Sequence, residues 1–201
     1  MAATTLPKTA PAPPAPSAEL ERLLRRFLRE FDDLSGQMER GAISEAAWAK
    51  KMGELVSDSH QAAMMSGAST ATMPGDLTET LERVVQVQHD FLDNFEDDVK
   101  SEGWQAAYNS RVRQYLDAAQ ISYHYGKMFE DVGKVIPLPA MPSEGTICLS
   151  NCGCSWDISV VNAAKGDYDA TWKLGKIDNC QTCIERAAQW SPVRVRGGVL
   201  Q

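Results

Sequence analysis

The fold depends most on residues 148–183, which read CLSNCGCSWDISVVNAAKGDYDATWKLGKIDNCQTC. Apolar and polar side chains alternate over residues 156–160 and again over residues 168–174, which is the period of a half-buried strand. Residues 162–167 between these stretches contain Asn and Gly and predict a turn. We therefore expect a β-hairpin with one group of cysteines before its first strand and another group after its second strand.

All five cysteines of the chain lie within its last 54 residues. Because a hairpin brings its two ends together, the two cysteine groups should meet, and four thiolates at one corner make a closed tetrahedral zinc site. Clustered cysteines in a cytosolic protein indicate a metal more often than disulfides, and an odd number fits a closed disulfide framework poorly. We expect Cys148, Cys152, Cys180 and Cys183 to bind a structural zinc ion, with Cys154 as the spare thiol or as a substitute.

Other interpretations of the cysteines stay open at this point. The thiols could be reduced and buried, or could form disulfides after release, and the pair Cys180-x2-Cys183 could be redox-active or nucleophilic. The redox interpretation is weaker because no parallel-sheet unit precedes the pair. A catalytic zinc usually includes a histidine ligand and keeps an open position, whereas no histidine follows His124. The pattern therefore predicts a structural metal site and not an enzyme.

The part of the chain before the cysteines predicts four amphipathic helices. Apolar residues recur there every three or four positions, as on one face of a helix. Ser44 is expected to cap the second helix, and Ile43 and Trp48 should form a hydrophobic staple beside the cap. Such helices can close a shared core. They are expected from Ser17 to Gly41, from Ser44 to about Ala63, from Leu77 to Lys100, and from near Trp104 to Phe129.

These patterns together predict an α+β protein, with an N-terminal bundle of about four helices and a small C-terminal module of a β-hairpin and a helix. A lobe of this size buries little apolar surface on its own, which favours stabilisation by zinc. A short helix near residues 181–190 and a last edge strand within 192–201 would complete the module. The expected divisions are a flexible Ala/Pro-rich arm at 1–16, the helical domain at 17–133, a Pro-rich linker at 134–146 and the Cys-rich zinc-binding module at 147–201.

Charge and hydropathy exclude several classes of function. The chain has 20 basic and 27 acidic residues and a net charge of -7, which does not suggest a general nucleic-acid binder. No stretch approaches the roughly 18 apolar residues of a membrane span, and the first residues lack the apolar core of a signal peptide. We therefore expect a soluble cytosolic protein. His60, His89 and His124 lack the Glu-x-x-His pairs of a di-metal bundle and are expected to be surface or capping residues.

Three features of the C-terminal module occur together. They are the element Asn151-Cys152-Gly153-Cys154, a hairpin that carries tryptophans, and the pair Cys180-x2-Cys183 followed by Trp190 and Pro192. In this combination the module resembles the C-terminal part of phage head-morphogenesis (Mu F-like minor head) proteins. That family carries a Cys-x2-Cys pair and, later, an Asn-Cys-x-Cys element preceded by His. Here the two elements stand in the reverse order, and Cys148 stands roughly where the His would be.

The resemblance implies a non-enzymatic minor capsid or head-morphogenesis protein that is made in the host cytoplasm and joins the virion. Its partners would be other phage structural proteins, capsid or portal, in an oligomeric assembly, with no membrane and no specific nucleic-acid ligand. The alternative is a cellular zinc-ribbon-like adaptor or regulator that binds protein or nucleic acid. The mildly basic ending Arg194-Val-Arg196 suits that alternative, but the chain from Gly145 onward has six basic and five acidic residues.

Overall fold

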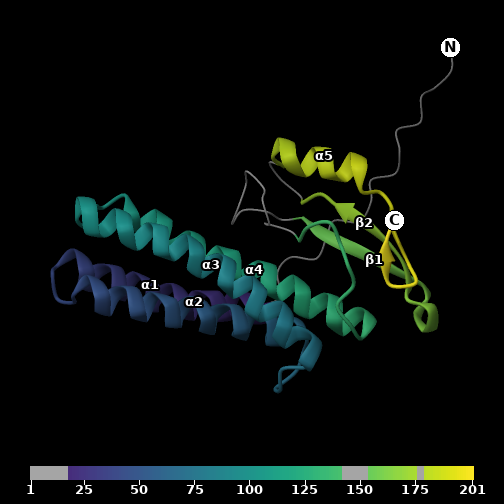
Figure 1. Ribbon diagram of the computed structural model, residues 1–201, viewed down its shortest axis with the longest axis horizontal. Helices are drawn as coiled ribbons and strands as arrows, with labels where there is room; N and C mark the ends of the chain where they lie inside the picture. Colours follow the sequence, from purple (N-terminus) through teal and green to yellow (C-terminus); the bar gives the residue numbers. More distant parts are fainter. Residues whose placement is uncertain (1–17, 142–153, 176–178) are drawn as a thin grey trace, which may run out of the picture.

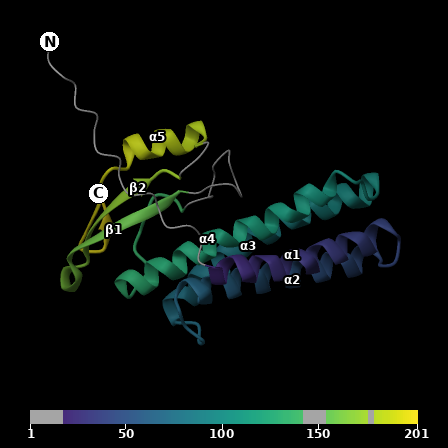
Figure 2. The same ribbon diagram turned by 180° about the vertical axis from the view of Figure 1, so that it is seen from behind.

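The computed structural model describes residues 18–141, 154–175 and 179–201, and it has an α+β architecture (Figure 1). Four long helices come first and lie along one another, and a small antiparallel sheet with one short helix follows, as the view from behind also shows (Figure 2). The predicted fold class is confirmed at this level. The elements are α1 (Ala18–Glu39), α2 (Glu45–Gly67), α3 (Gly75–Glu102), α4 (Tyr108–Val132), β1 (Ser155–Asn162), the 3-10 turn η2 (Ala163–Lys165), β2 (Asp167–Lys173), α5 (Gln181–Gln189), β3 (Val193–Arg196) and β4 (Val199–Leu200).

The four long helices close around an apolar core that the sequence stripes predict. Phe31 of α1, Trp48 of α2 and Phe95 of α3 are all fully buried in it. The rings of Trp48 and Phe95 meet edge to face with their centroids 5.3 Å apart. Burial of a large apolar side chain contributes about 1.5–3 kcal/mol, so this cluster is a main source of stability. Its other buried members are Phe27, Leu34, Met38, Met52, Val56, Leu92, Val99, Val112, Tyr115 and Leu116.

The start of α2 agrees with the prediction, whereas the start of α4 does not. The Ser44 Oγ accepts a hydrogen bond from the Ala47 N–H at 3.3 Å, and Ile43 packs on the core that contains Trp48. α4 begins at Tyr108, four residues after Trp104. The backbone leaves the helix at Gly103, with a φ of 73°, and the Trp104 ring then lies 5.4 Å from the ring of Trp48. The predicted start of the last helix was wrong because Trp104 enters the core from a loop.

α2 and α4 cross at two glycines with almost no space between their backbones. A Cβ added to Gly126 of α4 would stand 2.0 Å from the Met64 carbonyl oxygen of α2. A Cβ added to Gly67 of α2 would stand 2.2 Å from the Tyr123 carbonyl oxygen of α4. Real Cβ atoms do not approach backbone so closely, so this crossing requires glycine on both helices.

The predicted hairpin is present, and the sheet extends it by two strands in the order β1-β2-β3-β4. Trp156 of β1 pairs with Trp172 of β2, and Ser155 pairs with Lys173. β3 and β4 form a second antiparallel pair, so the predicted last edge strand is a short hairpin. Along β2 the alternate residues Tyr168, Ala170 and Trp172 are buried, which is the period-two pattern of a sheet with one covered face.

A second apolar core joins the sheet to the helical bundle. Ile136 and Met141, from the described part of the predicted linker, are buried in it together with Tyr168 and Val195 of the sheet. The Trp156 indole N–H donates to the Ala140 carbonyl oxygen at 2.9 Å. The described part of this stretch is therefore a packed connection, while the predicted domain boundaries themselves stay predictions. The helical members of this core are Met64, Leu77, Val84, Ile121, Tyr125 and Met128.

Candidate functional site

Three of the five cysteines lie in described parts of the chain, and they share one cluster. Cys154 directly precedes β1, Cys180 is the N-cap residue of α5, and Cys183 lies in the first turn of α5. Cys154 and Cys183 are buried with Trp172, and Cys180 packs against the same cluster. Cys148 and Cys152 lie outside the described residues.

The hairpin register brings Cys154, the one described cysteine of the first group, to the same corner as Cys180 and Cys183. Because Ser155 pairs with Lys173, the start of β1 lies beside the end of β2, from which the chain runs on to α5. The Asn179 amide then holds this corner, since its nitrogen donates to the Gly175 carbonyl oxygen at 3.0 Å. Its oxygen lies 3.9 Å from the Cys154 Sγ, at the long limit for a thiol hydrogen bond.

A metal centre cannot be assembled from the described residues alone. Among residues 18–141, 154–175 and 179–201, no group of three or more His, Cys, Asp and Glu side chains is placed to hold a metal ion. The four-thiolate set expected from the sequence needs Cys148 and Cys152, which fall outside those ranges. Cys154, Cys180 and Cys183 share an apolar cluster but do not by themselves form such a group, so the predicted zinc ligands stay a prediction.

Three tryptophans, Trp156, Trp172 and Trp190, pack in the cysteine cluster. The ring of Trp172 lies 5.1 Å from that of Trp156 and 5.6 Å from that of Trp190, in both cases edge to face. The backbone N–H of Trp172 also donates to the Trp190 carbonyl oxygen at 3.0 Å, which ties the end of α5 to β2. The Arg186 guanidinium lies over the rings of Trp190 and Trp172, at 5.0 and 5.5 Å. Arg186 was not among the residues expected at this site, although its spacing of four residues from Trp190 was a signal that the two side chains could meet.

The indole N–H of Trp172 is an orphaned polar group inside this cluster. It is buried, and no residue in the described ranges accepts a hydrogen bond from it. A buried donor without an acceptor costs about 1–3 kcal/mol, so such groups usually have a partner. A thiolate sulfur accepts N–H donors readily, and the two buried cysteines of the cluster show that sulfur gathers at this place.

One of the three histidines does not lie where the sequence predicts. His60 is fully buried between α2 and α4, where its Nδ1 lies 2.8 Å from the Ser122 Oγ, so its expected place at the surface or a cap was wrong. Desolvation by burial, with a smaller effect of the nearby His89, lowers the pKa of His60 to about 4. Burial also lowers the pKa of His124 to about 4. These histidines are neutral parts of the helix packing at neutral pH.

A serine and a histidine lie together between α2 and α3. The His89 Nε2 is 3.1 Å from the Ser57 Oγ and 3.3 Å from the Gly53 carbonyl oxygen. A carbonyl oxygen only accepts, so this contact needs the proton on Nε2. The Ser57 hydroxyl donates to the same carbonyl at 2.9 Å, so its proton does not point at an imidazole base. The pair is a hydrogen-bonded link between two helices.

One of the two arginines at the basic end of the chain, Arg196, is bonded within the sheet. Arg196 donates to the Tyr168 carbonyl oxygen at 2.8 Å and to the Asp169 Oδ1 at 2.6 Å. Arg194, the next residue but one, is exposed on β3. One of the two arginines that suited an anion-binding alternative is therefore neutralised by its own sheet.

No protein-family model, no curated protein and no solved structure shows a significant match to this chain. None of the helices that the structure describes is long and apolar enough to cross a membrane.

Proposed function

We propose that this chain is a structural or assembly protein of a phage particle, a minor head or head-morphogenesis component, with a structural zinc ion in its C-terminal module. The observation that carries the proposal is the convergence of Cys154, Cys180 and Cys183 on the buried ring of Trp172. These cysteines and tryptophans include the elements in which the module resembles the Mu F-like minor head proteins. Host cytoplasm during assembly and then the virion would be its locations.

The donor chemistry of the cysteines supports the zinc part of the proposal. Thiolates are the preferred donors of structural zinc, and the orphaned indole N–H of Trp172 suits a neighbouring metal-bound sulfur. Cys180 and Cys183 would hold the ion from the start of α5, with two ligands from Cys148, Cys152 and Cys154. When bound, the ion would supply a crosslink between the hairpin and α5 and no reaction chemistry.

The connection between the two parts of the molecule supports a structural role. Residues 136–141 pack into the core shared by α4 and the sheet, and Trp156 bonds to the backbone of that connection. A module fixed in this way would present its surface to a capsid or portal partner at a constant angle to the helices. Such preorganisation lowers the entropy cost of assembly.

Incorporation into particles tests this function. In a host that makes the phage, particles banded on a density gradient should contain the tagged chain, as measured by mass spectrometry. Cys183→Ser should remove zinc from the purified chain and abolish incorporation, whereas Lys165→Ala, at an exposed position of the η2 turn, should leave both unchanged. Absence of the unmodified chain from particles would contradict the proposal. Salt-sensitive binding of nucleic acid by the free chain would instead favour the adaptor alternative.

A further inference from the structure

A cavity of about 1010 Å³ lies between α3, α4 and the connection after α4. Its walls are mainly apolar, with Val84 and Phe91 from α3, Ile121 from α4, and Leu138 from the connection. A volume of this size is typical of small-molecule sites, which are mostly apolar and carry a few polar groups for orientation. None of the described cysteines and tryptophans of the cluster above lines this cavity.

The wall from α3 carries two apolar side chains that remain open to solvent. Phe91 is 57% exposed and Val87, one helical turn before it, is 47% exposed. Both line the cavity. Large apolar residues on one ridge of a helix gain free energy when a ligand covers them, at about 25 cal/mol per Å² of apolar surface removed from water.

A glutamine in the same wall offers a polar contact to an occupant of the cavity. Gln88 lines the cavity and is only 9% exposed. Within the described ranges no hydrogen bond joins its side-chain amide to another residue. A molecule in the cavity that accepts a hydrogen bond from Gln88 would gain one polar contact there.

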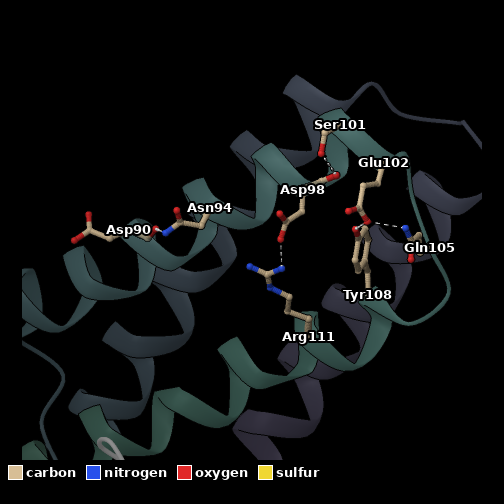
Figure 3. A network of polar contacts seen from close by, with 8 residues as sticks. All are labelled: Asp90, Asn94, Asp98, Ser101, Glu102, Gln105, Tyr108 and Arg111. Carbon is tan, nitrogen blue, oxygen red and sulfur yellow. Dashed lines mark hydrogen bonds and ion pairs between the residues drawn. The ribbon is translucent and has the colours of Figure 1, made fainter.

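The charge of the lining selects an anion. Arg83 and Arg111 line the cavity, whereas no Asp or Glu stands among its described lining residues, although the whole chain has a net charge of -7. Figure 3 shows that the Arg111 guanidinium points to Asp98, and its Nη1 lies 2.5 Å from the Asp98 Oδ2. The charge of Arg111 is therefore already neutralised by Asp98.

Arg83 is the cation that the cavity has available. Its guanidinium lies 6.0 Å from the centroid of the Tyr125 ring, and no carboxylate in the described part of the chain lies within ion-pair distance of it. A guanidinium beside an apolar cavity matches a carboxylate carried on an apolar body, because it offers the carboxylate paired donors.

We propose that this cavity binds a small amphipathic carboxylate, with its acid group at Arg83, its apolar body along Val87 and Phe91, and Gln88 as a further polar contact. The site is separate from the cysteine cluster and does not depend on the proposed function.

Calorimetric titration of the full chain with dodecanoate, below its micelle concentration, tests the proposal. We expect saturable binding of about one molecule per chain. Arg83→Gln should weaken it at least about tenfold, as the loss of one charged contact does. Val87→Asp should abolish it by placing a carboxylate in the apolar wall. Arg29→Gln, an exposed arginine on α1, is the matched control and should leave the affinity unchanged.

Both replaced wall residues are exposed, so the variants should stay folded, which circular dichroism checks. Absence of saturable binding, or equal affinity in the Arg83→Gln, Val87→Asp and Arg29→Gln chains, would overturn the proposal. So would a chain that is dimeric by light scattering and becomes monomeric in Val87→Asp, because a second copy would then cover this wall.

Discussion

Gly126 of α4 lies directly against the Met64 carbonyl of α2, so that a Cβ at position 126 would stand 2.0 Å from that oxygen. This contact fixes the distance between the two helices at the end of the bundle that faces the sheet. Met64 and Met128, near the two glycines of the crossing, belong to the core that also contains Tyr168 of β2. The spacing of α2 and α4 therefore helps to set where the sheet packs.

Gly126→Ala should lower the free energy of unfolding by about 3 kcal/mol, because the helices must separate to admit the methyl group. Urea denaturation measures the change. Gly53→Ala is the matched control on α2, since its Cβ would meet the His89 ring and the Leu92 side chain at an ordinary 3.9 Å. That control should raise the stability by up to about 1 kcal/mol through helix propensity. Equal effects of the two substitutions would show that α2 and α4 do not touch at Gly126.

The buried His60 should make stability depend on acidity. Its pKa is about 4 in the folded chain and 6.5 for the exposed group, so between these values the unfolded chain binds more protons. The free energy of unfolding should therefore fall as the pH drops from about 6.5 to 4, by about 3 kcal/mol from this residue. His60→Gln should keep a hydrogen bond to Ser122 and flatten the dependence, with the contribution of His124 remaining. Urea denaturation at several pH values measures the two slopes, and identical slopes would contradict the assignment.

The two arginines of β3 should differ in their effect on stability. Arg196 is bonded to the Tyr168 carbonyl and to Asp169, so Arg196→Ala should cost about 1–2 kcal/mol. Arg194 is exposed, and Arg194→Ala should change the free energy of unfolding by less than about 0.5 kcal/mol. Thermal denaturation of the two variants measures the difference. A larger loss for Arg194→Ala would mean that this edge of the sheet is arranged differently.

The helices and the hairpin could be predicted because their signals are local. The apolar stripes that contain Phe31, Trp48 and Phe95 repeat with the helical period. Trp156 and Trp172 each belong to a stretch in which apolar and polar residues alternate, so each pattern is visible within its own segment. The convergence of Cys154 with Cys183 followed from the hairpin alone. In these cases a periodic pattern or a chain reversal determines the result.

The features that the sequence analysis missed depend on contacts between distant segments. An isolated glycine in a helical stretch, such as Gly67 or Gly126, signals close packing but does not name its partner. The segment from Pro137 onward resembles a linker because prolines break helices, yet Ile136 and Met141 find a core made by residues far along the chain. His60 looked polar enough for the surface because its partner, Ser122, lies 62 positions away in sequence.

A zinc ion in the cysteine cluster is the central claim, and metal content tests it directly. Protein purified without a chelator and kept reduced should contain about one zinc ion per chain by plasma mass spectrometry. Cys183→Ser should lose the metal and unfold the C-terminal module, while the helical circular dichroism signal largely persists. Comparing Cys148→Ser, Cys152→Ser and Cys154→Ser should identify the one variant that keeps its zinc. A folded, reduced chain that contains no zinc would contradict the central claim.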